Sequence, residues 1–210
     1  MHVLFAHGLW SSPRSSKATW MRQTLGWTVD AIDLHRYGWS ARAQMEAVMD
    51  AVTTNSSYDA LIGSSFGGLA VANAASRLPD HPLHLVLLAP AFGHPDLIRA
   101  DLGPEVMAMW ERTGYHRFEP IGWEAPIDLP WSFMAEGADL DWPDLVHPTG
   151  ILHGRQDAVV PYQNSERAVA GSEVATLTLV EDDHRLASSL DHLPIVLGHV
   201  KSNVSNTPGA

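Results

Sequence analysis

The chain contains no cysteine among its 210 residues. That absence excludes disulfide bonds, cysteine-ligated zinc and a cysteine nucleophile together, and it is compatible with a reducing compartment. The sequence also begins without a basic, apolar leader, and none of its apolar runs approaches the roughly 18 residues of a membrane-spanning helix. We therefore expect a soluble, cytoplasmic protein.

Basic residues are scarce: 13 Lys and Arg stand against 24 Asp and Glu, which gives a formal net charge of −11. A surface this acidic repels phosphate backbones and anionic lipid, so we expect neither nucleic acid nor a membrane as a partner. The sequence lacks the G-x-G-x-x-G and G-x-x-x-x-G-K-[ST] motifs of nucleotide sites, and its 12 histidines form no H-E-x-x-H pattern. It therefore predicts no cofactor and no metal ion.

Short apolar runs alternate with longer amphipathic ones along most of the chain. This alternation predicts a mostly parallel sheet of about six strands with helices on both faces, a three-layer α/β fold in one domain over residues 1–200. The strands are expected at residues 3–6, 28–34, 58–64, 83–89, 149–154 and 175–180, and the helices at 17–25, 41–52, 67–78, 162–170 and 186–200. Residues 201–210 have the composition of a flexible tail.

Residues 93–147, here called the insertion, break this rhythm. They show no clear strand pattern, yet they hold Trp110, Trp123, Trp131 and Trp142. So much apolar surface must cover something, and we expect the insertion to form a lid over a substrate pocket. Trp110 and Trp131, together with Trp10 outside the insertion, are the candidate substrate contacts. The alternative is a satellite cluster packed at the sheet edge, away from any site.

The sequence Gly63-Ser64-Ser65-Phe66-Gly67 matches G-x-S-x-G. In that motif the serine occupies a sharp turn from a strand to a helix, and the glycines permit the tight turn and close helix packing. The match follows a predicted strand and precedes a predicted helix. It therefore indicates Ser65 as a nucleophile, and a plain Gly/Ser-rich turn is the other interpretation.

The first predicted strand ends in His7-Gly8-Leu9-Trp10. An acyl-transfer enzyme needs two N–H donors aimed at the tetrahedral oxyanion, one after the nucleophile and one in the loop after an earlier strand. Phe66 N–H and Leu9 N–H fit these places, with Trp10 N–H as the second choice in the loop. We expect His7 to brace this loop, and an ordinary turn at a strand end is the alternative.

An acid and a base follow the last two predicted strands. Asp157 lies in the loop after Gly154, and His184 follows the final strand. The order Ser, Asp, His is the one used by serine hydrolases with a nucleophile elbow, so we expect Asp157 to orient His184 as the general base. Asp182 and Asp183 are rival acids, although residues so close to His184 on one loop rarely turn back onto it.

Taken together, His7-Gly8, the Ser65 motif, the Asp157 loop and Asp183-His184 resemble the α/β-hydrolase superfamily. More narrowly, they are similar to the small bacterial YqiA-like esterases, over Met1 to about Val200 without the insertion. The resemblance implies an α/β-hydrolase fold that begins at the superfamily's third strand. It also implies esterase activity, with the triad and oxyanion donors named above. The insertion is longer than in compact members of that group.

These observations predict a serine hydrolase of carboxylic esters with short to medium acyl chains, which acts through an acyl-enzyme on a small-molecule substrate without a cofactor. The same residues could cleave thioesters or amides, because the fold does not fix the leaving group. A ligand-binding protein that keeps the fold without turnover is the third hypothesis.

Overall fold

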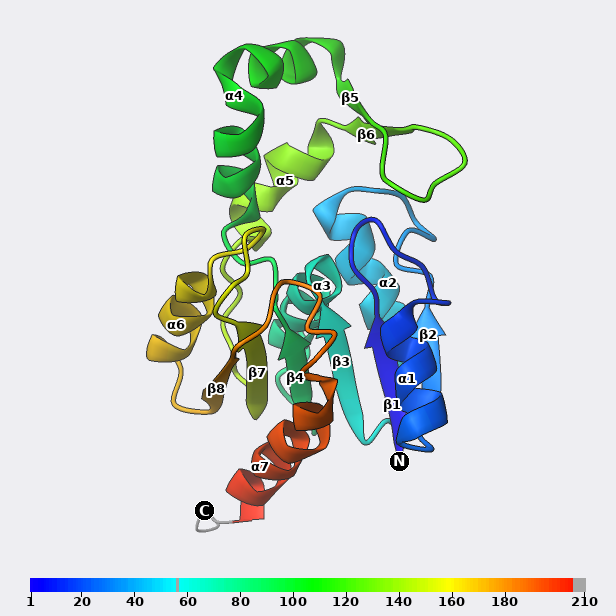
Figure 1. Ribbon diagram of the computed structural model, residues 1–210, viewed down its shortest axis with the longest axis vertical. Helices are drawn as coiled ribbons and strands as arrows, with labels where there is room; N and C mark the ends of the chain where they lie inside the picture. Colours follow the sequence, from blue (N-terminus) through cyan, green and yellow to red (C-terminus); the bar gives the residue numbers. More distant parts are fainter. Residues whose placement is uncertain (56, 206–210) are drawn as a thin grey trace.

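The computed structural model describes residues 1–55 and 57–205 (Figure 1). Its centre is a sheet of six strands in the order β2-β1-β3-β4-β7-β8, and every neighbouring pair is parallel. The strands are β1 (His2–Ala6), β2 (Thr28–Ile32), β3 (Ala60–Ser64), β4 (Leu85–Leu88), β7 (Thr149–Gly154) and β8 (Ala175–Val180). The predicted three-layer fold with a mostly parallel sheet is confirmed.

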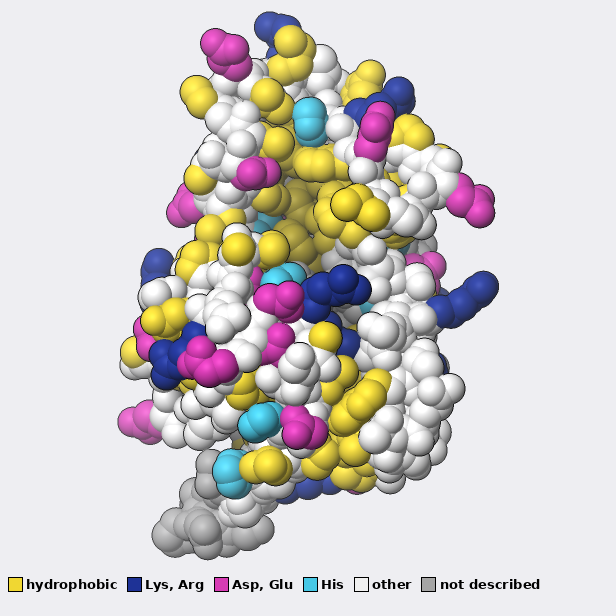
Figure 2. Space-filling model, viewed as in Figure 1, with side chains coloured by type: hydrophobic (Ala, Val, Ile, Leu, Met, Phe, Trp, Pro, Cys, Tyr) yellow, Lys and Arg dark blue, Asp and Glu magenta, His cyan; other side chains and the backbone are white. Residues whose placement is uncertain are grey.

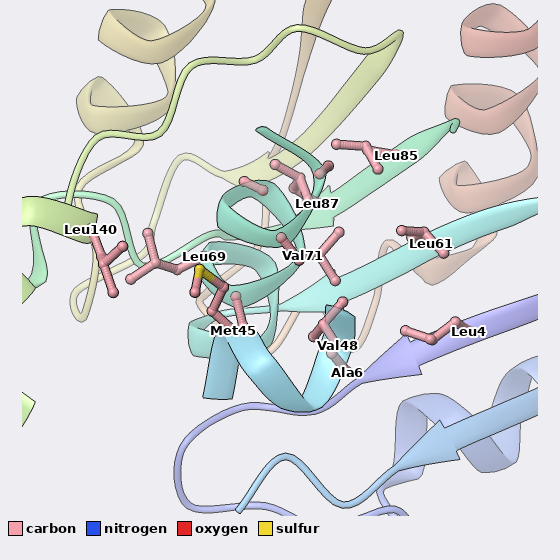
Figure 3. Close-up of a cluster of buried hydrophobic side chains, with 14 of the residues drawn as sticks. Leu4, Ala6, Met45, Val48, Leu61, Leu69, Val71, Leu85, Leu87 and Leu140 are labelled. Atoms are coloured by element: carbon pink, nitrogen blue, oxygen red, sulfur yellow. The ribbon is translucent and has the colours of Figure 1, made fainter. Parts of the chain in front are cut away.

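Helices cover both faces of this sheet, which explains why the inner strands β3, β4 and β7 are buried along their whole length. Alternate residues of one strand belong to different clusters: Leu4 and Ala6 pack on one face, Val3 and Phe5 on the other. One face carries α2 (Ala41–Thr54), α3 (Phe66–Ser76) and α6 (Tyr162–Ala170), and Figure 3 shows its core around Val48 and Val71. The other face carries α1 (Ser16–Thr24) and α7 (Leu193–Ser205). The sheet, these helices and the loops that join them outside the insertion are here called the body.

The strand order reverses next to β1. The chain runs from β1 to β2 on one side and then crosses to β3 on the other side of β1. Open parallel sheets bind ligands at the carboxyl ends of the strands where the order reverses. Ala6 pairs with Gly63 at that end, so the loops that follow β1 and β3 begin side by side.

The insertion rises above the carboxyl ends of the sheet strands, in green in Figure 1. It contains α4 (His94–Thr113), an antiparallel pair of strands, β5 (Tyr115–Phe118) and β6 (Ile127–Pro130), and α5 (Ser132–Leu140). Helix α4 bends sharply at Gly103, whose φ of 75° is left-handed and which precedes Pro104. The core of the insertion surrounds Trp110 and Phe133, and it also includes Leu9 of the body.

Three sequence predictions differ from the structure. The β5–β6 pair was not predicted, because its short strands are largely exposed and show no run of buried residues. The final helix starts at Leu193 instead of residue 186, since Leu186 has a φ of 53°. That helix continues to Ser205, so residues 201–205 of the predicted tail are helical, and 206–210 lie outside the described residues. Within the described part of the chain, no helix is long and apolar enough to cross a membrane.

Candidate active site

Ser65 occupies a strained turn between β3 and α3. Its backbone has φ 55° and ψ −118°, values that a residue with a side chain rarely adopts. The turn is tight because backbone segments approach one another closely. A Cβ on Gly63 would overlap the Gly67 carbonyl, and a Cβ on Gly67 would overlap the Ala6 carbonyl. The two glycines are therefore required by close approach, and the turn raises the Ser65 hydroxyl above the sheet edge.

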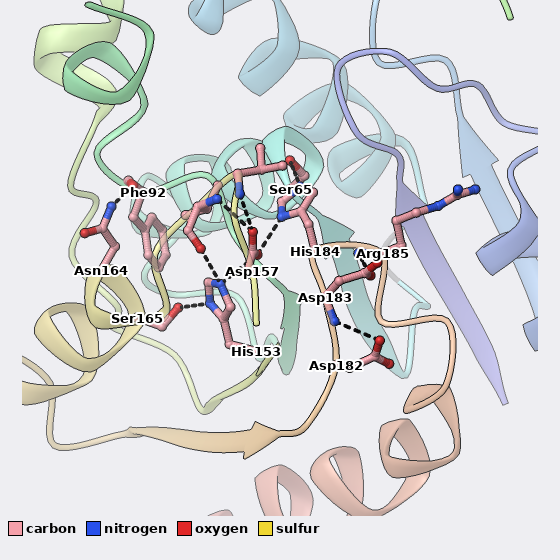
Figure 4. Close-up of polar contacts among 12 residues, drawn as sticks. Ser65, Phe92, His153, Asp157, Asn164, Ser165, Asp182, Asp183, His184 and Arg185 are labelled. Atoms are coloured by element: carbon pink, nitrogen blue, oxygen red, sulfur yellow. Dashed lines mark hydrogen bonds and ion pairs between the residues drawn. The ribbon is translucent and has the colours of Figure 1, made fainter. Parts of the chain in front are cut away.

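The structure brings together the three residues predicted to form a triad (Figure 4). His184 Nε2 lies 3.0 Å from Ser65 Oγ, and His184 Nδ1 lies 2.6 Å from Asp157 Oδ2. The Asp157 side chain is fully buried, whereas 20% of the His184 side chain is exposed. Ser65 Oγ–H can thus donate to His184, whose Nδ1–H donates to Asp157.

The Asp157 carboxylate accepts hydrogen bonds at both of its oxygens. Oδ1 accepts from the backbone N–H groups of Val159 and Val160, each at 2.8 Å. Oδ2 accepts from His184 and also from His153, whose Nε2 lies 3.0 Å away. Burial alone would raise the pKa of Asp157, but these hydrogen bonds, with His153 first, outweigh it and hold that pKa well below its usual range. Asp157 is therefore ionised whenever His184 acts as a base.

The rival acids bind the loop that carries His184. Asp182 accepts from the backbone N–H groups of Asp183 and Ser188, and Asp183 accepts from that of Arg185. A Cβ on Gly154 would overlap the Asp182 backbone, so this glycine lets the end of β7 approach the His184 loop. Asp182 and Asp183 thus shape the loop, while Asp157 reaches the imidazole.

The loop after β1 lies beside Ser65. A Cβ on Gly8 would be 3.5 Å from Ser65 Cβ. His7 braces this loop, as predicted, because its Nδ1–H donates to Gly8 O at 2.9 Å and its Nε2 accepts from Leu34 N–H at 3.2 Å. Among the described residues, the N–H groups of Leu9 and Phe66 have no hydrogen-bond acceptor. Neither N–H group is therefore committed to a backbone acceptor within this part of the chain.

A cavity of about 530 Å³ opens beside Ser65 and Phe66. Its walls are mostly apolar and come from helix α4 of the insertion and from the loop that follows Asp157. The α4 residues are His94, Leu97, Ile98, Ala100 and Asp101, and the loop residues are Ala158, Val159, Val160 and Pro161. Figure 2 shows hydrophobic side chains gathered around a hollow between the insertion and the body. Helix α4 of the insertion therefore lines the cavity beside Ser65.

The three tryptophans named as candidate substrate contacts lie in different places. Trp110 has no exposed surface and donates its Nε1–H to Leu129 O, so its predicted contact with substrate is wrong and it forms the core of the insertion. Trp131 packs on Trp110 and does not line the Ser65 cavity. Trp10 lines a second cavity of about 670 Å³ with the β5–β6 loop, whose Trp123 donates to Trp10 O.

Sequence reasoning missed His153. It lies within the Asp157 segment and is fully buried, but its side chain had no assigned role. The available signal was its position, four residues before the acid at the end of a buried strand. A buried imidazole needs partners for both nitrogens, and one of those partners is the acid itself.

One cluster has the composition of a metal site: the ligand atoms of His7, Asp33 and His35 lie within 4.8 Å of one another. Both nitrogens of His7 already bind protein atoms, Gly8 O and Leu34 N–H. Its only lone pair is therefore occupied by a backbone donor, which leaves this cluster one ligand short.

Comparisons with known proteins show which family the chain belongs to. The model of the uncharacterised protein family UPF0227 matches residues 2–199. Mouse palmitoyl-protein thioesterase ABHD10, mitochondrial, is 27% identical over 150 residues, 64% of this chain and 48% of that protein. The chain thus spans about half the length of the curated relatives it matches.

Two solved structures share the fold. Mouse alpha/beta hydrolase domain-containing protein 10 has a TM-score of 0.72 and 20% identity, and the match covers 97% of this chain and 89% of that one. Monoacylglycerol lipase of Paleococcus ferrophilus has a TM-score of 0.70 and 18% identity over 95% and 94%. The predicted resemblance is confirmed: the chain has the α/β-hydrolase fold and belongs to the UPF0227 family.

Proposed function

We propose that this protein is a serine hydrolase that cleaves small-molecule carboxylic esters through an acyl-enzyme. The observation that carries the proposal is the hydrogen-bonded chain from Ser65 Oγ through His184 to the buried Asp157, at a strained turn beside a mostly apolar cavity. A fold alone does not assign an activity, but this arrangement of nucleophile, base and acid has a defined chemistry.

In the proposed reaction, Ser65 Oγ attacks the ester carbonyl while its proton passes to His184 Nε2. The N–H groups of Leu9 and Phe66 stabilise the oxyanion that forms. His184 then returns the proton to the departing alcohol, which leaves the acyl group on Ser65. A water molecule, deprotonated by His184, releases the acid and regenerates Ser65.

The cavity supports a preference for short to medium acyl chains. Leu97 and Ile98 of α4 line it together with Val159 and Val160, so an acyl chain would contact apolar side chains. Thioesters are the second candidate substrates, because the curated mouse relative is named as a palmitoyl-protein thioesterase. We also propose a cytoplasmic location, although the same relative is named as mitochondrial.

The test uses a fluorophosphonate probe and matched substrates. The probe should label the wild-type protein and the Ser64→Ala variant, but not Ser65→Ala, because only an activated serine reacts. Butyryl and palmitoyl p-nitrophenyl esters, compared with thioesters of the same acids, then define the leaving group and chain length. A wild-type protein that resists the probe and cleaves none of these substrates would favour a non-catalytic ligand-binding protein.

A further inference from the structure

Asp157 lies between two histidines, and only one of them belongs to the proposed triad. The other, His153, is the fifth residue of β7 and has no exposed surface. Its Nε2 lies 3.0 Å from Asp157 Oδ2 and 3.0 Å from Val160 O. Its Nδ1 lies 2.7 Å from Ser165 Oγ of α6, a residue that is also fully buried. Figure 4 shows the imidazole directly below the Asp157 carboxylate.

The partners of His153 define its protonation. A carboxylate and a carbonyl can only accept, so Nε2 must carry a hydrogen. In the Nε2–H tautomer the lone pair lies on Nδ1, which accepts the Ser165 hydroxyl hydrogen. Every polar atom of this imidazole is thus satisfied, and the ring is held from β7, the Asp157 loop and α6 at once.

Asp157 Oδ2 accepts hydrogen bonds from both His184 and His153, while Oδ1 accepts hydrogen bonds from two backbone N–H groups. The Asp157 side chain is fully buried, so bulk water has no access to replace a lost donor there. Without His153, the one remaining hydrogen-bond donor to Oδ2 among the described residues would be His184, the ring that accepts and returns a proton in the proposed reaction.

We propose that His153 is a positioning residue for the reaction: it fixes the Asp157 carboxylate in the orientation that directs His184 toward Ser65. This inference rests on the proposed function and extends it to a residue outside the triad. A slower reaction with unchanged substrate binding is the expected consequence.

The experiment compares His153→Leu, which removes the donor, with His153→Gln, whose side-chain N–H can still reach Asp157. His147→Leu is the matched control, because the His147 side chain is also buried and, within the described part of the chain, bonds only Ala75 O of α3. Rates are divided by the fraction of each protein that fluorophosphonate labels, which corrects for misfolded molecules. The substrate is p-nitrophenyl butyrate.

His153→Leu should lower kcat by about tenfold to a hundredfold with KM nearly unchanged, the size of a small misplacement of catalytic groups. His153→Gln should recover most of the rate, because its side-chain N–H replaces the lost donor to Asp157. An unchanged corrected kcat in His153→Leu, or an equal loss in His147→Leu, would overturn the proposal. Absence of wild-type labelling would instead refute the proposed function itself.

A measurement on the wild-type protein needs no variant. Imidazole ¹⁵N NMR should show His153 as the Nε2–H tautomer with an exchange-protected proton. A hydrogen on Nδ1 alone would contradict the bond to Asp157 and would therefore exclude the positioning role.

Discussion

The body and the insertion are stabilised in different ways. In the body, strands such as β3 are buried along their whole length, and their alternate side chains belong to two large apolar clusters on the two faces of the sheet. In the insertion, the strands are partly exposed, and one small cluster forms around Trp110 and Phe133. The proposed catalytic residues all belong to the body, while the insertion supplies Leu97 and Ile98 to the cavity wall. We infer that the body carries the chemistry and the insertion controls access.

The strongest test of these separate roles of the body and the insertion is a substitution in the proposed triad that leaves the cavity wall intact. Asp157→Asn should reduce kcat by about 10³ to 10⁴, because the amide favours the wrong imidazole tautomer. The preference among acyl chains should not change, since the Leu97 and Ile98 side chains are untouched. Steady-state kinetics on a series of p-nitrophenyl esters measures both quantities.

Asp183→Asn is the control for this variant, because Asp183 accepts only a backbone hydrogen bond in the His184 loop. It should cost less than about tenfold in kcat. If Asp183→Asn were the more damaging change, the acid of the triad would be assigned to the wrong residue.

A second comparison concerns stability. Trp110→Ala should destabilise the insertion by about 3 to 5 kcal/mol, and Leu61→Ala in the body should cost about 2 to 5 kcal/mol. Hydrogen exchange separates the two effects. Trp110→Ala should lower amide protection in α4 and α5 and spare β3 and β4, whereas Leu61→Ala should lower it throughout. Equal loss of protection in both regions would show that the insertion and the body unfold as one unit.

The smallest expected effect concerns specificity. Ile98→Ala enlarges the cavity at α4, so it should raise kcat/KM for longer acyl chains by about tenfold, since one methylene group in an apolar pocket is worth about 1 to 3 kcal/mol. The value for the best short ester should stay within about twofold. Met109→Ala, on the exposed side of α4, is the control and should change neither value.

The body could be predicted because its local signals agree with its packing. Strands buried on both faces appear as apolar runs, and the tight approaches at Gly63, Gly67 and Gly154 leave glycines in the sequence. The contact between Asp157 and His184 could be predicted because the two residues follow the last two strands of the sheet, β7 and β8, which are neighbours.

The insertion could not be predicted in the same way. Its tryptophans have the composition of a ligand pocket, but composition does not distinguish a pocket wall from a small core. Trp110 proved to be core, and the cavity wall comes from Leu97 and Ile98, which no motif marks. The pairing of His153 with Asp157 also escaped prediction, because it depends on how the loop after β7 folds back on the strand.

The central claim is that Ser65 becomes acylated during turnover. The direct measurement is rapid acid quenching of the protein with p-nitrophenyl butyrate, followed by peptide mass spectrometry. We predict a butyryl group on the peptide that contains Ser65, absent in Ser65→Ala and present in Ser64→Ala. Hydrolysis with no butyryl adduct on Ser65, or with the adduct on another residue, would contradict the account.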